Sequence, residues 1–162
     1  MKAKLWKHEK NWNELNEYLN IIGFNLRQVG KENILYSKDV LNGISDDIFE
    51  TIDHIQNSLC FIGLGSGLSW LAWALNKKVV MISGFPDPKC EFQTDNVRII
   101  NKNVCNSCFN NTEYNFDRSW DWCPATKDFI RTKTIEPEFV FINVRNLILE
   151  LFLERINLKL KI

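Results

Sequence analysis

The stretch LCFIGLGSGLSWLAWALNKKVVMISGF, residues 59–85, decides the fold of this chain. An apolar run is followed by a glycine-rich turn, then by a segment that suits a helix, and then by a second apolar run. Two short apolar strands joined through a turn and a helix form the unit from which parallel sheets are built. The stretch therefore predicts an α/β fold, with a mostly parallel sheet that helices cover on both faces.

The alternation of strands and helices continues on both sides of this unit. Strands are expected over residues 3–7, 24–29, 59–63, 79–83 and 97–101, and helices over residues 11–23, 46–56, 67–75 and 138–157. Asn11 is the expected N-cap of the first helix, with Glu14 at the capping-box position. The segment from 102 to 128 lacks a clear period. A chain of 162 residues suffices for one domain with a core.

The glycine-rich turn is the first candidate site. Gly63, Gly65 and Gly67 allow a sharp turn and a close approach of the backbone to a ligand. Ser66 and Ser69 add hydroxyl groups, and the helix start presents N–H groups that lack helical partners. These parts predict a phosphate-binding loop at the carboxyl end of a strand. The alternative is a tight strand-to-helix turn that binds nothing.

Four cysteines form the second candidate site, with the spacing C-x14-C-x2-C-x14-C. They are Cys90, Cys105, Cys108 and Cys123. Four thiolates around one ion favour zinc or iron, and a closed shell of this kind is structural. Two disulfides, or four unrelated buried thiols, are the alternatives. Cys60 lies in an apolar run and is expected to be an ordinary buried thiol.

The composition excludes several classes of function. Formal net charge is zero and no basic run occurs, which argues against a nucleic-acid partner. No stretch of 18 apolar residues occurs, so no membrane span is expected. Residues 1–20 lack the apolar core of a signal peptide, which favours a cytoplasmic location and reduced thiols. His8 and His54 lie in no nucleophile motif, so no hydrolase constellation is expected.

The segment GSGLSWLAWALNKKVVMISGFPDP, residues 65–88, resembles the nucleotide-binding region of the heptosyltransferases. That region has an Asp-Thr-Gly-Leu-Ser-His loop, a helix, a strand and a further loop. Gly65 and Ser66 stand where aspartate and threonine are usual. The directly matching residues are Gly67, Leu68 and Ser69.

The cysteine segment narrows the resemblance to one branch. Residues 105–124, CNSCFNNTEYNFDRSWDWCP, resemble the metal-binding insertion of the autotransporter strand-loop-strand O-heptosyltransferases, which are cytosolic bacterial enzymes. The opening KLWKHEKNWNELNEYLNIIGF, residues 4–24, resembles the start of their C-terminal domain. After Cys123, residues 124–134 depart from the family pattern.

The resemblance implies a Rossmann-like sheet that forms the C-terminal half of a GT-B glycosyltransferase. Residues 1–162 would be one sugar-nucleotide-binding domain, with a metal-binding insertion at about 90–123 and without the N-terminal acceptor domain. The implied reaction transfers heptose from ADP-heptose to serine residues of an autotransporter adhesin, although the isolated chain is expected to be inactive. No catalytic residue is assigned.

The resemblance also implies ligands and partners. The donor would bind at Glu32, beside the ribose, and along the loop Gly65, Ser66, Gly67, Leu68 and Ser69. The four cysteines would hold iron, with zinc as the alternative, and the subunits would assemble into a homo-oligomer. The rival hypothesis is a non-catalytic assembly module in which the metal knuckle makes subunit contacts and the glycine turn is only structural. Nucleotide binding distinguishes the two.

Overall fold

The computed structural model describes residues 6, 8–31, 40–115 and 122–159. Its α-helices are α1 (His8–Ile21), α2 (Ile48–Gln56), α3 (Gly67–Ala74), α4 (Ile130–Lys133) and α5 (Pro137–Lys159). The strands are β1 (Arg27–Gly30), β2 (Leu41–Ile44), β3 (Phe61–Leu64), β4 (Val79–Ile82) and β5 (Asn96–Ile99). Two short 3₁₀-helices, η2 (Pro88–Cys90) and η3 (Cys108–Asn110), lie after β4 and β5.

Every strand pairing among the described residues is parallel. Strands β3, β4 and β5 form a three-stranded sheet in that order, with Phe61 opposite Val79 and Val79 opposite Asn96. Strands β1 and β2 form a separate two-stranded parallel pair. The predicted α/β fold with parallel sheets is thus confirmed.

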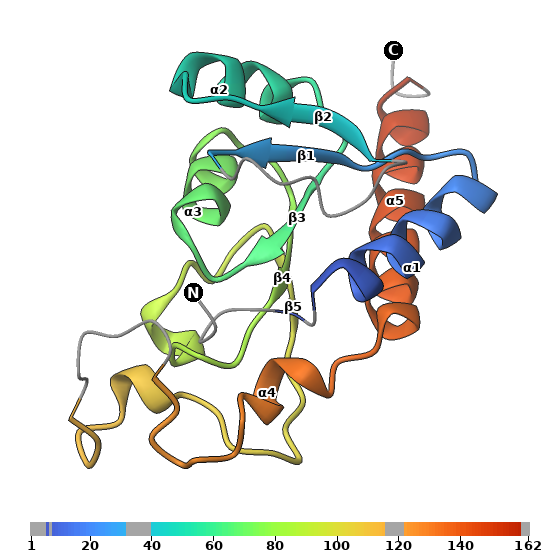
Figure 1. Ribbon diagram of the computed structural model, residues 1–162. Coiled ribbons are helices and arrows are strands. Elements are labelled where there is room, and N and C mark those ends of the chain that lie inside the picture. The colour runs from blue at the N-terminus through green and yellow to red at the C-terminus, as the bar shows by residue number, and fades with distance from the viewer. Residues whose placement is uncertain (1–5, 7, 32–39, 116–121, 160–162) are drawn as a thin grey trace.

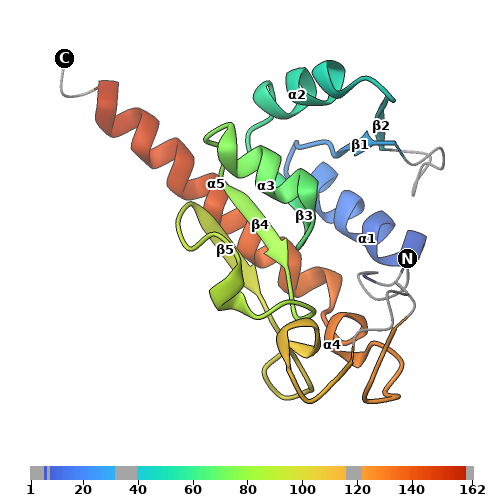
Figure 2. The ribbon, with the colours of Figure 1, turned by 90° about the vertical axis from the view of Figure 1, so that its left-hand side faces the viewer.

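Helices cover both faces of the strands, as predicted (Figures 1 and 2). On one side α2 packs on β1 and β2, and α3 packs on β3 and β4. On the other side α5 packs on β4 and β5, and α1 packs on α5. The second half of α5 extends past the sheet (Figure 1), and several of its apolar side chains are exposed.

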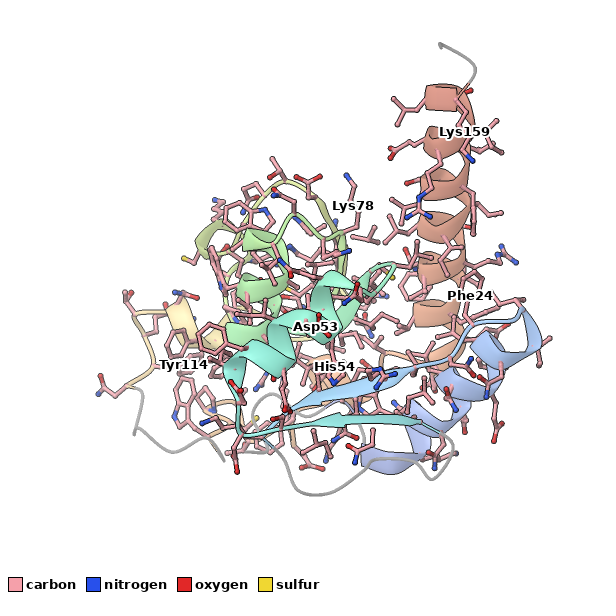
Figure 3. All side chains as sticks on the ribbon, turned by 90° about the horizontal axis from the view of Figure 1, so that it is seen from above. Phe24, Asp53, His54, Lys78, Tyr114 and Lys159 are labelled. Carbon is pink, nitrogen blue, oxygen red and sulfur yellow. The ribbon has the colours of Figure 1, made fainter. Side chains whose placement is uncertain are left out.

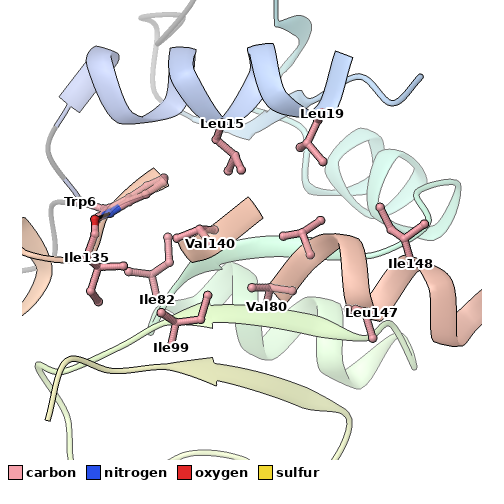
Figure 4. Close-up of a cluster of buried hydrophobic side chains, with 11 residues drawn as sticks. Trp6, Leu15, Leu19, Val80, Ile82, Ile99, Ile135, Val140, Leu147 and Ile148 are labelled. Atoms are coloured by element: carbon pink, nitrogen blue, oxygen red, sulfur yellow. Dashed lines mark hydrogen bonds between the residues drawn. The ribbon is translucent and has the colours of Figure 1, made fainter. Parts of the chain in front are cut away.

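Strand β4 lies at the centre of the core because both of its faces are buried. Val80 and Ile82 point toward α5 and α1, whereas Val79 and Met81 point toward α2 and α3. This explains its continuous apolar sequence, since a strand covered on both sides needs no polar face. Figure 4 shows the apolar cluster on the side of α5 and α1, formed by Trp6, Leu15, Leu19, Val80, Ile82, Ile99, Ile135, Val140, Val144, Leu147 and Ile148.

Some predicted boundaries are wrong. Helix α1 begins at His8, so Asn11 lies inside the helix and is buried instead of capping it. On α2 the N-cap is Asp47, whose side chain accepts a hydrogen bond from the backbone N–H of Phe49. The Phe49 side chain is 75% exposed, since α2 packs through Thr51 and Ile55. The strand expected at residues 3–7 lies almost wholly outside the described residues.

No helix in the described part of the chain has both the length and the hydropathy that crossing a bilayer requires.

Candidate functional site

The glycine loop joins β3 to α3, as the sequence predicts. Strand β3 ends at Leu64 and α3 begins at Gly67. Ser66 is the N-cap residue, with extended backbone, but its side chain accepts no hydrogen bond from the helix. The first turn of α3 therefore has no side-chain cap, and its N–H groups and the positive end of the helix dipole suit an anionic ligand.

The glycines of the loop have different physical roles. A Cβ added to Gly65 would collide with Oε1 of Glu91, so a side chain there would displace this buried carboxylate. A Cβ added to Gly67 would meet no atom within 4 Å, so the fold does not require glycine at this position. Gly67 instead leaves open the space through which a ligand could reach the helix start.

Two residues that the resemblance assigns to donor binding have structural contacts. Ser69 is fully buried, and its hydroxyl donates a hydrogen bond to the carbonyl oxygen of Leu64 at 2.6 Å. It therefore fixes the shape of the loop. Leu68 packs against the carboxyl end of β1, where its Cδ1 would lie 3.2 Å from a Cβ on Gly30. Glu32, the predicted ribose ligand, lies outside the described residues.

A groove of about 1870 Å³ opens beside the loop. Near the loop its lining includes Gly30, Lys31, Ser45, Ser66 and Gly67, which come from the carboxyl ends of β1, β2 and β3. Ligands of open α/β sheets bind at such strand ends. The volume exceeds that of typical small-molecule pockets, so a sugar nucleotide would fit.

Helix α2 forms another wall of the groove and carries His54. His54 lies in the last turn of α2 and is half-buried (Figure 3). Its neighbour Asp53 accepts a hydrogen bond from the side chain of Asn57 at 2.9 Å. These contacts suit the end of a helix and assign no catalytic role.

A buried carboxylate that the sequence did not single out supports the loop from behind. Glu91 is 7% exposed and forms an ion pair with Arg98 on β5. Ser83 Oγ donates to Glu91 Oε2 at 3.2 Å, and Arg98 Nη2 donates to the carbonyl oxygen of Phe92 at 2.9 Å. Since Glu91 also contacts Gly65, this network connects the glycine loop to the segment that carries Cys90.

The segments that carry the four candidate metal ligands, Cys90, Cys105, Cys108 and Cys123, form an irregular lobe below the sheet (Figure 1). Backbone hydrogen bonds join its parts, from Ser107 N–H to Gly84 O at 2.9 Å and from Phe109 N–H to Phe85 O at 3.2 Å. The Asp87 N–H also donates to Asn110 Oδ1 at 2.8 Å. These bonds hold η3 against the loop that leads to η2.

Three of the four predicted metal ligands lie near one another in this lobe. Cys108 is buried, and Cys123 packs on the apolar cluster that contains it. Burial raises the pKa of the Cys108 thiol, the charge of Arg131 opposes this rise, and charges on Cys105 and Cys123 add to it. Cys90, in contrast, is exposed on η2.

Arg131 lies in the same lobe and is fully buried. Its guanidinium carbon lies 5.0 Å from the ring centroid of Phe85 and 5.4 Å from that of Phe129. Burial acts to raise the pKa of Cys123, but hydrogen bonds from the backbone and the charge and hydrogen bond of Arg131 hold that pKa below its usual value. Arg131 thus interacts directly with the Cys123 thiol.

The structure does not show the predicted four-thiolate metal site. The described residues include all four, yet no three His, Cys, Asp or Glu side chains there are placed to hold a metal ion. All five cysteines are free thiols, so the disulfide alternative is not observed. The four-cysteine metal centre therefore stays a prediction.

The sequence of this chain is similar to those of several named proteins. No family model matches the chain. Autotransporter heptosyltransferase Aah of Escherichia coli is 38% identical over 135 residues, which cover 77% of this chain and 34% of Aah. TibC of Escherichia coli O78:H11 is 35% identical over 136 residues, covering 78% of this chain and 33% of TibC. The chain is a homologue of the autotransporter heptosyltransferases.

A third relative of this heptosyltransferase homologue is named inactive. BimC of Burkholderia thailandensis, an inactive autotransporter heptosyltransferase, is 34% identical over 126 residues, covering 72% of this chain and 29% of BimC. The homologue thus spans about a third of the length of the relatives that it matches.

The solved structure of TibC matches the heptosyltransferase homologue over nearly its whole length. The TM-score is 0.84 at 29% identity, covering 93% of this chain and 43% of the TibC chain. TibC is described there as a dodecameric, iron-containing heptosyltransferase in complex with ADP-D-β-D-heptose. The family that the sequence resemblance implied is confirmed, and so is an α/β fold with parallel sheets that is similar to TibC.

The thiols of the heptosyltransferase homologue should differ widely in reactivity. Cys90 is exposed and should be the first to react with iodoacetamide. Cys60 should be among the slowest, because burial raises its pKa to about 11, against an opposing effect of the Lys77 charge. Peptide mass spectrometry after timed alkylation at pH 8 measures both rates. Similar rates for the two thiols would contradict this placement.

The raised pKa of Cys60 also predicts how the stability of the fold depends on pH. Because the Cys60 pKa is raised in the folded state, the contribution of the neutral thiol to folding stability is complete below pH 9. This contribution is lost as the pH rises toward 11. The free energy of unfolding should therefore fall by up to about 2–3 kcal/mol more in the wild type than in Cys60→Ala over this range. Urea unfolding of both proteins at pH 8 and pH 10.5 tests the difference.

Proposed function

We propose that this chain is the donor-binding part of an autotransporter heptosyltransferase and that it binds ADP-heptose. In the complete enzyme the heptose would pass to serine hydroxyl groups of an autotransporter adhesin. The observation that carries the proposal is the glycine loop between β3 and α3, which opens onto a groove in a fold that matches ADP-heptose-bound TibC.

The geometry supports binding of the donor diphosphate at the start of α3. Gly67 leaves its outer side open, and the uncapped first turn offers N–H groups for phosphate oxygens. Ser66 can add its hydroxyl group, since its side chain does not cap the helix. Lys31, at the carboxyl end of β1, supplies positive charge to the same groove. Ser69 acts indirectly by fixing the loop.

Donor binding alone does not complete the reaction. Transfer to a serine hydroxyl requires a general base within hydrogen-bond reach of that hydroxyl. We assign no such residue in this chain, and we propose that it comes from an acceptor domain outside residues 1–162. One relative, BimC, is named inactive, so similarity to this family does not by itself imply transfer activity.

The oligomeric state and the metal of this chain are separate questions. TibC is dodecameric, and exposed apolar side chains on α5, such as Leu149, Phe152 and Leu153, support a contact with further protein in this chain too. TibC is also iron-containing, and an iron ion held by the four cysteines of this chain stays a proposal. The rival assembly module is less favoured, since it leaves the open loop unexplained.

A substitution at Gly67 tests the loop directly. Gly67→Val should keep the fold, because an added Cβ meets no protein atom within 4 Å, but the side chain should block the approach of phosphate. We expect the variant to melt within a few degrees of the parent and to lose the rise in melting temperature that ADP gives the parent. Differential scanning fluorimetry with and without ADP measures both.

Ala74→Val is the matched control, since it adds a branched side chain to an exposed position at the other end of α3. This control should keep the full ADP-induced shift. An equal shift in Gly67→Val and in the parent would show that ADP binds elsewhere.

A further inference from the structure

Donor binding does not explain why the strands form two separate sheets. Strands β1 and β3 both line the groove, yet among the described strands β1 pairs only with β2 and β3 only with β4. We propose that the space between Arg27–Gly30 and Phe61–Leu64, the strand slot, binds one further parallel β-strand. This strand is an apolar segment from the part of a heptosyltransferase polypeptide that precedes α1 and lies outside residues 1–162. It binds whether or not the glycine loop holds a nucleotide.

The order of the described strands supports a strand at this place. The strands of a doubly wound sheet have the order 3-2-1-4-5-6. Here β2, β1, β3, β4 and β5 correspond to positions 3, 2, 4, 5 and 6, so position 1 falls between β1 and β3. The carboxyl ends of β1 and β3 meet at the same edge, since Leu68, just after β3, lies against Gly30 at the end of β1.

Helix α1 runs in the direction that a crossover helix requires. Trp6, just before α1, belongs to the apolar cluster that includes Ile82, the last residue of β4 (Figure 4). The helix thus starts at the carboxyl ends of the strands, and after its end at Ile21 the chain enters β1 at Arg27. A strand that precedes such a helix lies parallel to the strand that follows it. Because Trp6 also lines the groove, a strand that leaves the slot would lead directly to α1.

The walls of the slot suit an apolar strand that is covered on both faces. On the side of α1 and α5 the groove is lined by Trp12, Leu19 and Ile148, and on the side of α2 and α3 by Ile55 and Leu71. Central strands of parallel sheets are apolar because helices cover them in this way.

Strand β3 has the composition of a central strand but not the burial. Ile62 and Leu64 are only half-buried, whereas every residue of β4 is buried. The Phe61 N–H bonds toward β4, and the Gly30 carbonyl oxygen bonds toward β2. Since alternate residues of a strand direct their backbone groups to opposite edges, those of Ile62 and Val29 point into the slot.

The chemistry of the slot favours a segment from outside this chain. The first residues, MKAKL, have Lys2 and Lys4 two positions apart, so in a strand both ammonium groups would point to one apolar face. Burial of unpaired charges there is unfavourable. The relatives contain further polypeptide that can supply an apolar strand, since this chain covers 34% of Aah and 33% of TibC.

Hydrogen exchange of the full chain, measured by NMR, tests whether the slot is open. The amides of Val29 and Ile62 should exchange at least about 100-fold faster than those of Phe61 and Gly63, which belong to the β3–β4 pair. Equal protection of these amides would overturn the proposal, because the slot would then already be filled. Protection that depends on protein concentration would identify a second copy as the occupant, and protection that does not would identify a segment of this chain.

A strand supplied within the same polypeptide gives the positive test. A designed segment of about five valine and isoleucine residues, the average strand length, is joined ahead of Met1 through a flexible linker. It should protect the Val29 and Ile62 amides at least about 100-fold and raise the melting temperature by at least about 5 °C. The same extension made of serine and aspartate should do neither. An apolar extension that leaves these amides unprotected would contradict the strand slot.

Proline variants of the extended chain locate the strand. Val29→Pro removes an N–H that points into the slot, and it should abolish the gain in melting temperature. Asn42→Pro is the matched control at the outer edge of β2, because the neighbouring Leu41 N–H bonds toward β1. This control should keep the gain, and equal gains in the two variants would show that the extension binds elsewhere. If Val29→Pro does not fold, the exchange rates of the parent with and without the extension still decide the matter.

Discussion

Replacing Glu91 with alanine is expected to lower the free energy of unfolding by about 3–5 kcal/mol. The Glu91 side chain is 4% exposed and that of its ion-pair partner Arg98 is 13% exposed. The substitution removes the carboxylate but leaves the buried guanidinium and the hydroxyl of Ser83 without this acceptor. A charge left unpaired in a protein interior costs far more than the net contribution of the pair.

Urea unfolding followed by circular dichroism measures the loss. Asp95→Asn is the matched control, because it weakens the exposed Lys78–Asp95 pair, whose side chains are 35% and 50% exposed, and asparagine tolerates the positive φ at this position. That change should cost less than about 1 kcal/mol. Equal losses in the two variants would show that the Glu91 network contributes no more than a surface ion pair.

The second large effect is expected at Trp6. This side chain is 1% exposed, and its indole N–H donates to the carbonyl oxygen of Ile135 at 2.7 Å. It also makes an edge contact with Trp12, with ring centroids 4.9 Å apart. Trp6→Ala removes a core aromatic and should cost about 3–5 kcal/mol. The chain segment before α1 would then no longer hold the start of α5.

Two further variants separate the sources of this loss. Trp6→Phe keeps an aromatic ring but leaves the buried Ile135 carbonyl without its donor, so it should cost about 1–3 kcal/mol. Trp70→Ala removes a tryptophan that is 42% exposed, and it should cost clearly less than Trp6→Ala. If Trp70→Ala costs as much, the assignment of Trp6 to the main core is wrong.

The sequence predicts the centre of the fold better than its edges. The unit β3–α3–β4 was expected within about two residues, because apolar runs and glycines mark its limits. Strand β2 was missed, since Leu41–Ile44 contains Asn42 and Gly43 and lacks an apolar run. The start of α1 was placed three residues late, because Asn11 has the composition of a cap but is buried inside the helix.

The candidate site was also predictable from the sequence only in part. The loop and its position at a strand end were predictable from local composition, but the different roles of Gly65 and Gly67 depend on Glu91, which is distant in sequence. The cysteine spacing indicates a cluster but does not reveal that Cys90 is exposed whereas Cys108 is buried. No sequence signal marks Arg131, because its burial depends on tertiary packing.

Isothermal titration calorimetry of the full chain with ADP tests the central claim most directly. We predict saturable heat with one ADP per chain, weaker binding of AMP, which lacks the second phosphate, and no binding to Gly67→Val. The absence of heat with protein that is shown to be folded, or equal heat from Gly67→Val, would contradict the assignment of the loop as the donor site.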